Sequence, residues 1–371
     1  MALRTRLDHR LKARSLCPKV AHRLTCDAKS ASFKALTGGH NCKDTKMRAA
    51  FYEANGPARE VIKVGEADTP RPDSGEVRVK LAASGVNPSD VKARIGSTRK
   101  IAFPRVIPHS DGAGTIDMVG SGVPAARVGE RVWTWNAQWL RPFGTCAEYV
   151  TLPSEMAVRL PESTSFEAGA CLGIPAMTAY HAVAVAEAKP GMTLLVSGGA
   201  GAVGHYAIQF AKMAGANVIT TISSPEKAKL AQAAGADHTI DYRRENAGER
   251  VMALTGKKGV DAVIELDIAA NAKLMPQVLR PRGTVVVYGT GAPEAEVPLF
   301  FFLRNAIALK FIYVYELTPA ERAAALGAIS RALEAGALIN NVAVTFPLAE
   351  SVAAHEAVEQ AKVLGNVVVT I

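Results

Sequence analysis

The distribution of apolar residues changes near Phe166, and this change predicts two kinds of structure in one chain. Before Phe166 the apolar runs are short, such as Glu76–Ala82 and Arg131–Thr134, and turns rich in Gly, Pro and Asp separate them. Short strands with closely spaced turns are typical of a compact, mostly antiparallel, barrel-like domain. After Phe166 strand-length apolar runs alternate with segments of helical period. That alternation is the rhythm of βαβ units and a parallel sheet.

The second part is expected to hold five strands, connected by four helices, and a sixth strand near Leu309–Tyr313. An alanine-rich helix is expected from Pro319 to Ala335. The final segment, Gly365–Ile371, reads as a strand that most simply returns to the first domain. The sequence therefore predicts an α/β fold with a parallel sheet inserted into a β-barrel domain. The five strands are expected at 192–197, 217–222, 237–240, 260–265 and 284–288, and the four helices at 203–214, 225–234, 245–254 and 270–279.

A glycine-rich turn between two of these elements carries the strongest functional signal. The apolar run Met192–Val196 ends in Gly198-x-x-Gly201-x-x-Gly204, and a helical segment and a second apolar run, Val218–Ile222, follow. Strand, glycine turn, helix and strand form the unit that binds the pyrophosphate of a dinucleotide, with the phosphates at the helix N-terminus. We expect the cofactor to contact Gly198, Ala200, Gly201, Ala202, Val203 and Gly204.

The end of the second strand of this unit favours NADPH over NADH. An acidic residue there would bind the ribose 2′-hydroxyl of NAD, but this chain has Ser223 and Ser224, with Lys227 one turn into the next helix. Hydroxyl groups and a nearby cation suit a 2′-phosphate, and Tyr242 at the end of the third strand is expected beside it. The alternative is that Lys227 is only a solvated lysine and that Glu226 reaches the ribose.

Charge and composition exclude several classes of protein. The 371-residue chain has a net charge of +9, but residues 1–46 hold 11 Lys/Arg and 3 Asp/Glu, which leaves 32 and 31 in the remainder. Since phosphate-driven binding needs clustered positive charge, this nearly neutral body makes nucleic acid an unlikely partner. No apolar run approaches the roughly 18 residues of a membrane span. Only Cys146 and Cys171 follow residue 46, which indicates a reducing compartment, and we expect a cytoplasmic protein.

Residues 1–46 have no sustained apolar period, and fold-like sequence begins at Met47 with an expected edge strand. We expect a disordered basic extension. Three explanations stay open: a true start at Met47, an organelle presequence that is rich in Arg and poor in acids, or a basic arm for an anionic partner such as RNA.

Several motifs in the same order resemble one known family. They are Ser84-Gly-Val-Asn-Pro-Ser-Asp, Gly173-Ile-Pro-Ala-Met-Thr-Ala-Tyr, the glycine turn, Ala234-Gly-Ala-Asp and Arg282-Gly-Thr-Val-Val-Val-Tyr-Gly. From about Met47 to Ile371 the chain resembles the zinc-independent medium-chain dehydrogenases/reductases, especially the zeta-crystallin-like NADPH:quinone oxidoreductases.

The resemblance implies a GroES-like barrel interrupted by a Rossmann domain, with the active site between them. The barrel would comprise 47–167, the NADPH-binding Rossmann domain 168–308, and the last sheet strand with the return to the barrel 309–371. The resemblance also implies a homo-oligomer, either a dimer or a tetramer.

The resemblance also bears on metal. Zinc-dependent relatives would have cysteine, histidine and cysteine where this chain has Asn87, Ser110 and Ile174. None of these three is a normal zinc ligand, so we expect no metal and no alcohol oxidation.

The chemistry that remains is direct hydride transfer from NADPH to a quinone or an α,β-unsaturated carbonyl. The resemblance places Asn87 at the cleft and Lys92 where relatives often carry Tyr, so the proton donor is Lys92, a water or another group. An enoyl or 2-alkenal reductase of the same fold is the alternative. Thr178 is expected under the nicotinamide. Further cofactor contacts are expected from Tyr288, Gly289, Thr290, Phe311, Ile312 and Tyr313.

All three tryptophans, Trp133, Trp135 and Trp139, lie in one short segment. They are either core and edge-strand residues or a flat apolar wall for an aromatic quinone.

Overall fold

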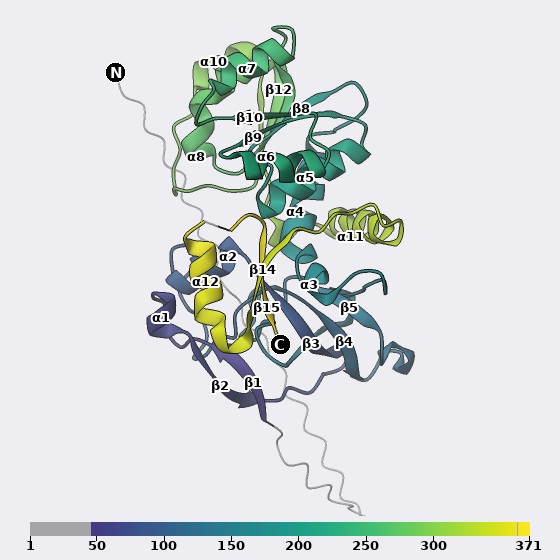
Figure 1. Ribbon diagram of the computed structural model, residues 1–371. Helices are drawn as coiled ribbons and strands as arrows, with labels where there is room; N and C mark the ends of the chain where they lie inside the picture. Colours follow the sequence, from purple (N-terminus) through teal and green to yellow (C-terminus); the bar gives the residue numbers. More distant parts are fainter. Residues whose placement is uncertain (1–45, 362) are drawn as a thin grey trace, which may run out of the picture. The chain divides into compact units, whose positions relative to one another are not determined.

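The computed structural model describes residues 46–361 and 363–371, and its elements are drawn in Figure 1. The expected basic extension lies outside the described residues, apart from Lys46. The described chain opens with a strand at Met47, as expected; it forms a two-stranded sheet with the next strand and an isolated bridge from Ala49 to Ala147. These two strands are β1 (Lys46–Phe51) and β2 (Lys63–Asp68).

The first large sheet has seven strands in the order β14-β15-β3-β4-β5-β7, with β6 paired to β3. All pairs are antiparallel except β14 with β15. Val77, Val79 and Leu81 alternate along β3 and are buried, which is the period of a strand with one face on a core. The strands are β3 (Glu76–Val86), β4 (Asp111–Val119), β5 (Arg131–Thr134), β6 (Tyr149–Pro153), β7 (Ala157–Arg159), β14 (Val342–Pro347) and β15 (Asn366–Thr370).

The second large sheet is parallel and has the strand order β10-β9-β8-β11-β12-β13. The order reverses between β8 and β11, which is the doubly wound arrangement of a Rossmann fold. Leu194, Leu195 and Val196 are fully buried in β8, as expected for a strand covered on both faces. The strands are β8 (Thr193–Val196), β9 (Asn217–Ile222), β10 (His238–Asp241), β11 (Val260–Glu265), β12 (Leu279–Val287) and β13 (Ala308–Phe311).

Helices connect these strands and cover the sheets (Figure 1). Those of the parallel sheet are α5 (Ala202–Met213), α6 (Pro225–Ala233), α7 (Ala247–Leu254), α8 (Ile268–Asn271), α9 (Met275–Val278) and α10 (Leu299–Asn305). The others are α1 (Ala58–Val61), α2 (Pro88–Ile95), α3 (Phe166–Gly169), α4 (Met177–Val185), α11 (Pro319–Glu334) and α12 (Ser351–Glu359).

The predicted fold class is confirmed, with three differences in detail. The single helix expected at 270–279 is divided into α8 and α9, because Pro276 is tolerated in the first turn of a helix but not in its interior. β12 begins earlier than expected. β14 and α12 were not predicted, and they precede the expected terminal strand β15, which pairs with β3.

Candidate active site and cofactor-binding site

The glycine turn between β8 and α5 has no room for larger side chains. Gly198 has a φ of +69°, in the left-handed region. A Cβ on Gly199 would lie 2.2 Å from Thr220 Oγ1, and one on Gly204 would lie 2.3 Å from the Gly198 carbonyl oxygen. The N-cap residue of α5, Gly201, has no side chain to cap the helix. The first N–H groups of this twelve-residue helix therefore remain available to an anion such as a pyrophosphate.

A buried glutamate at the end of β11 fixes the entrance to this turn. Glu265 is fully buried and its Oε2 accepts a hydrogen bond from Ser197 Oγ at 2.7 Å. Its Oε1 accepts from the Asp267 amide at 2.6 Å and from Asn271 Nδ2 at 2.8 Å. Glu265 thus joins the carboxyl ends of β8 and β11, where the strand order reverses. This residue was not predicted from the sequence.

Asp267 continues the connection to the next loop. Its Oδ1 accepts a hydrogen bond from the Gly291 amide at 2.8 Å. The predicted contact residues Tyr288, Gly289 and Thr290 immediately precede Gly291, at the end of β12. They therefore lie at the same edge of the sheet as the glycine turn.

The residues expected to select NADPH come together at the end of β9. Lys227 Nζ donates to Ser223 Oγ at 2.9 Å, and Ser224 Oγ caps α6 by accepting from the Lys227 amide at 3.3 Å. The Tyr242 amide donates to the Ile222 carbonyl at 3.2 Å, and its side chain is 54% exposed. The Lys227 cation thus contacts the Ser223 hydroxyl, and the backbone of Tyr242 is bonded to the end of the same strand.

Thr178, in the first turn of α4, has a buried hydroxyl without a hydrogen-bond partner among the described residues. An unpaired buried hydroxyl costs free energy unless a ligand or water pairs with it. This orphaned Oγ1 fits a cofactor contact. Beyond β12, the Ile312 amide bonds to the Val287 carbonyl at 3.0 Å, and the predicted cofactor contacts Phe311 and Tyr313 have exposed side chains.

Asn87 is held from the other side by a buried acid. Asn87 is the N-cap residue of α2, and its Nδ2 donates to Asp111 Oδ2 at 2.8 Å. The same oxygen accepts from the Ile174 amide at 2.8 Å, whereas Asp111 Oδ1 has no partner among the described residues. Burial raises the pKa of Asp111 well above its usual value, which favours the protonated carboxyl.

A second acid lies on the same helix turn. Asp90 Oδ2 accepts from the Asn87 amide at 2.8 Å, and burial raises the pKa of Asp90 to about 7 despite this hydrogen bond and the nearby Arg99. Lys92, on the next turn, donates from Nζ to the Thr290 carbonyl at 3.0 Å. This contact joins α2 to the loop after β12, so the structure brings both predicted catalytic residues, Asn87 and Lys92, to the cofactor edge.

The three positions that would hold zinc do not fit this metal. Ile174 has no donor atom in its side chain, and the Asn87 amide is bound to Asp111. The neighbouring His109 uses both ring nitrogens, with Ser84 Oγ at 2.8 Å from Nδ1 and His355 Nε2 at 3.0 Å from Nε2. Within residues 46–361 and 363–371, no three His, Cys, Asp or Glu side chains are grouped so as to hold a metal ion.

The three tryptophans differ in burial. Two of them therefore cannot belong to the apolar substrate wall that we expected. Trp133 is 0% exposed and Trp135 is 1% exposed, both within the main core, where a substrate has no access. Trp139 is partly buried, stacks on Tyr315 at 4.4 Å between ring centroids, and meets Tyr313 edge-on at 5.6 Å. Only Trp139 therefore remains a candidate for the substrate site.

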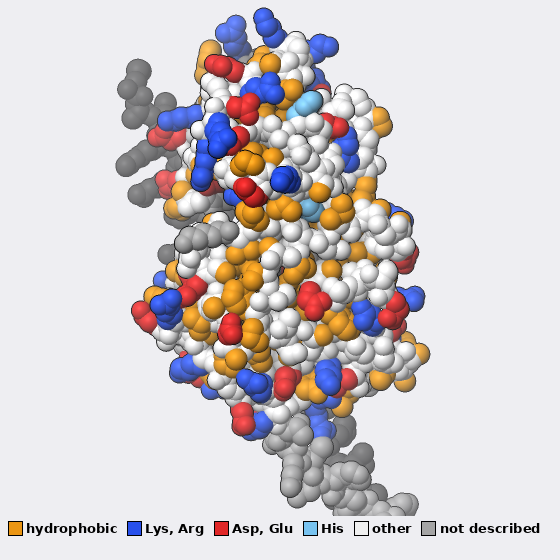
Figure 2. All heavy atoms as spheres, in the orientation of Figure 1, with side chains coloured by type: hydrophobic (Ala, Val, Ile, Leu, Met, Phe, Trp, Pro, Cys, Tyr) orange, Lys and Arg blue, Asp and Glu red, His pale blue; other side chains and the backbone are white. Residues whose placement is uncertain are grey.

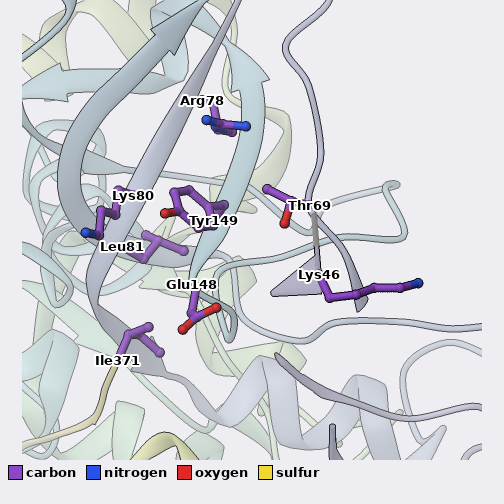
Figure 3. Close-up of a pocket in the computed structure, with 8 residues that line it drawn as sticks. All are labelled: Lys46, Thr69, Arg78, Lys80, Leu81, Glu148, Tyr149 and Ile371. Carbon is purple, nitrogen blue, oxygen red and sulfur yellow. The ribbon is translucent and has the colours of Figure 1, made fainter. Parts of the chain in front are cut away.

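Two cavities of the described residues lie away from these groups. The cavity in Figure 3, of about 480 Å³, is lined by charged and apolar residues that include Arg78, Lys80 and Tyr149. A second, of about 500 Å³, lies between α4, α5 and α11. Neither is lined by a predicted catalytic or cofactor-binding residue. The strand-order reversal and the unpaired Thr178 hydroxyl indicate the site more directly than cavity volume does, because they are features that a bound cofactor would contact.

Comparison with known families agrees with this geometry. Residues 73–162 match the alcohol dehydrogenase GroES-like domain, and residues 202–331 match the zinc-binding dehydrogenase family. A 2-haloacrylate reductase from Burkholderia sp is 30% identical over 335 residues, which cover 87% of this chain and 98% of that protein. The chain belongs to the medium-chain dehydrogenase/reductase family. Its relatives within this family are zeta-crystallin-like quinone oxidoreductases.

Two further members of the medium-chain dehydrogenase/reductase family illustrate the relationship. A quinone oxidoreductase from Pseudomonas aeruginosa is 31% identical and covers 86% of this chain and 98% of its own length. A mycobacterial protein whose structure was solved with NADPH is 30% identical, with a TM-score of 0.78 over 88% of this chain and 100% of that one. The similarity therefore extends over both sheets of the described structure.

Proposed function

We propose that this protein is an NADPH-dependent reductase of quinones or α,β-unsaturated carbonyls that acts by direct hydride transfer without a metal. The observation that carries the proposal is the Asn87–Asp111 hydrogen bond of 2.8 Å at the position where zinc-dependent relatives hold their metal. Beside it, the glycine turn, the unpaired Thr178 hydroxyl and Lys227 support a site for NADPH. A nicotinamide without a Lewis acid still reduces strongly electrophilic carbons, whereas it oxidises ordinary alcohols poorly.

The residues present fit NADPH. The glycine turn and the N-terminus of α5 would hold the pyrophosphate, and Ser223, Lys227 and Tyr242 would surround the 2′-phosphate. Thr178 Oγ1 would contact the nicotinamide side. NADPH supplies a hydride when bound, and a solved mycobacterial relative that carries it supports this choice.

Asn87 would donate a hydrogen bond to the substrate oxygen on which negative charge develops. Asp111 would orient the Asn87 amide, and because burial raises the pKa of Asp111, its carboxyl would repel that charge less than an exposed aspartate would. The final proton would come from Lys92, a water or another group. An enoyl or 2-alkenal reductase is the alternative activity, and the relative named 2-haloacrylate reductase supports an unsaturated acid as substrate.

The proposal is tested by NADPH oxidation with a panel of quinones, enals, enones and unsaturated acids. We expect turnover with at least one of these classes, none with ethanol, and unchanged rates in a chelator. Metal analysis of the same preparation is the control. Stoichiometric zinc whose removal abolishes turnover would refute the metal-free mechanism, and ethanol oxidation at a comparable rate would refute the substrate class.

Lys227→Ala should weaken NADPH binding and leave NADH binding almost unchanged. The loss of one charge-assisted hydrogen bond to the 2′-phosphate costs about 1.5–3 kcal/mol, or roughly 10- to 150-fold in affinity. Lys229→Ala is the matched control, since Lys229 lies on the same helix and is exposed. Fluorescence titration with both cofactors measures the effect. Equal losses for NADPH and NADH would show that Lys227 is only a surface lysine.

The surface gives no support to the alternative of nucleic-acid binding through the folded part. Figure 2 shows Lys and Arg interspersed with Asp and Glu over the visible face, without one continuous basic patch. No helix of the described residues is long and apolar enough to cross a membrane. Since residues 47–371 also carry 32 Lys/Arg against 31 Asp/Glu, we propose that any RNA binding comes from residues 1–46. A salt-dependent RNA shift that disappears when these residues are deleted would show this.

We propose that the protein assembles with further copies of itself. Strand β13 pairs only with β12 at one edge of the parallel sheet, and α10 beside it carries exposed apolar side chains. Leu299, Phe300 and Leu303 are 65%, 77% and 73% exposed. An open edge with an apolar neighbour suits self-association across a twofold axis. Light scattering measures the mass, and a monomer at micromolar concentration would contradict the proposal.

A further inference from the structure

Arg99 is a cation without a carboxylate partner at the substrate side of the site. It follows α2, and its guanidinium lies over the Trp139 ring, 5.1 Å from the ring centroid. It also donates to Gln138 Oε1. In the part of the chain that the structure describes, Arg99 forms no ion pair, and its side chain is only partly buried. A guanidinium has five N–H groups in a planar fork that matches a carboxylate, so most of its binding capacity is unused.

The ring under Arg99 belongs to an aromatic platform, which we define as Trp139, Tyr313 and Tyr315. Tyr313 and Tyr315 lie 5.2 Å apart, and Trp139 contacts both. The Tyr315 hydroxyl donates to Ser89 Oγ at 2.8 Å, two residues after Asn87. The platform is therefore attached to the helix turn that presents Asn87. Tyr313, which follows β13, has an exposed side chain, so the platform is open on one side.

Arg99 is the cation nearest this platform, Lys92 lies on the adjacent helix α2, and Glu316 and the buried Asp90 are acids close to the platform tyrosines. Lys92 pairs only with a backbone carbonyl, at 3.0 Å, and not with a carboxylate of the described chain. Among the described residues, neither Asp90 nor Glu316 lies within ion-pair distance of Arg99 or Lys92, and burial raises the pKa of Asp90 to about 7. Unpaired cations next to a low-dielectric wall attract anions to that place. A neutral quinone would leave both cations unused.

Resting on the proposed function, we propose that the substrate is an anion: a conjugated carbonyl compound that carries a carboxylate. Its flat conjugated part would lie against the exposed Tyr313, because Arg99 and Tyr315 already cover the Trp139 ring, and its carboxylate would pair with Arg99. In the reaction one alkene carbon gains the hydride of NADPH and the other gains a proton. The double bond becomes a single bond, and NADPH becomes NADP⁺. Arg99 takes no part in these steps and determines which substrates bind.

The test compares trans-4-oxopent-2-enoate with its methyl ester, which differ in charge at the same conjugated skeleton. The wild-type protein should prefer the carboxylate in kcat/KM. Arg99→Gln should lower kcat/KM for the carboxylate about tenfold or more, mainly through KM, and leave the ester within about twofold. Arg99→Lys should restore part of the loss, and added salt should weaken only the carboxylate.

Arg105→Gln is the matched control. Arg105 also lies over an aromatic ring, that of Phe51 at 4.1 Å, but it is already paired with Glu53 at 2.8 Å. This variant should keep the preference for the carboxylate. If both variants lose the preference for the carboxylate equally, that preference comes from the general surface charge, and the proposed role of Arg99 is wrong.

The outcomes separate this inference from the proposed function. Equal kcat/KM for acid and ester, or an equal loss for both in Arg99→Gln, would overturn the inference while the reductase stands. If no compound of the whole panel is reduced, the proposed function fails. Calorimetric binding of 4-oxopentanoate and its methyl ester then tests Arg99 alone: binding of the acid that Arg99→Gln abolishes supports the anion site, and no binding of the acid refutes it.

Discussion

Replacing Asn87 with alanine should lower kcat by about 10²- to 10³-fold, with a smaller change in KM for NADPH. A single donor aimed at developing negative charge contributes roughly 2.7–4 kcal/mol at the upper end. Asn87 is positioned for this task because the Asp111 carboxyl fixes its amide at 2.8 Å. Steady-state kinetics with the best acceptor of the panel measure the effect.

Ser97→Ala is the control for this variant. Ser97 Oγ donates to the Lys92 carbonyl at 3.2 Å at the other end of α2, so its loss perturbs the helix without touching the site. Melting temperatures of both variants show whether a slow enzyme is simply an unfolded one. If folded Asn87→Ala keeps wild-type kcat, the oxyanion is stabilised by another group.

The order of the elements was accessible from the sequence because it depends on local periodicity. The strand β9 (Asn217–Ile222) and the helix α11 (Pro319–Glu334) coincide almost residue for residue with the expected segments. The single helix expected at 270–279 was wrong because Pro276 begins a new helix, α9, and this signal is present in the local sequence. β14 was also readable, since Val342, Val344 and Phe346 alternate with less apolar positions.

The contacts between distant residues were not accessible in the same way. The hydrogen bond from Ser197 to Glu265 and that from Asn87 to Asp111 each join segments far apart in the sequence. Their existence depends on strand order and register, which periodicity does not specify. Glu265 was overlooked because a single acid at a strand end has no signature of its own.

The tryptophans show a different limit. Trp133 lies on β5, and Trp135 follows the end of this strand, yet both are buried on the core. Trp139, four residues further, is partly buried against Tyr315. A tryptophan of the core and a tryptophan of a substrate site can have the same sequence context. Only the packing of neighbouring elements distinguishes them.

The second large effect concerns stability and pH. Asp111→Asn should become progressively more stable than the wild type as the pH rises from about 4. Burial raises the pKa of Asp111 well above its usual value, whereas in the unfolded chain it titrates near 3.9. Between these values the folded wild type binds one more proton than the unfolded chain. Its stability therefore falls with rising pH by about 1.4 kcal/mol per pH unit. An asparagine cannot titrate, so this loss disappears.

Of the other buried groups near Asp111, the histidines contribute alike to both proteins, whereas Asp90 is coupled to Asp111. Burial raises the pKa of Asp90 to about 7, which makes stability fall in the same direction as for Asp111. Burial lowers the pKa of His109 to about 3 and that of His355 well below its usual value. Each histidine therefore makes the folded protein less stable as the pH falls below about 6.5. The histidine contributions are present in both proteins. Urea unfolding at several pH values, compared at each pH, therefore measures Asp111 together with its coupling to Asp90.

Asp111→Ala provides the contrast that decides the interpretation. Asparagine keeps an oxygen that accepts from Asn87 Nδ2 and from the Ile174 amide, whereas alanine leaves both donors buried and unpaired. Each orphaned donor costs about 1–3 kcal/mol, so Asp111→Ala should be less stable than Asp111→Asn at every pH. If the curves of the wild type and Asp111→Asn run parallel from pH 4 to 8, Asp111 is ionised in the folded protein. A charged Asp111 would repel the developing oxyanion, and the proposed role of the Asn87–Asp111 pair in stabilising that charge would then be wrong.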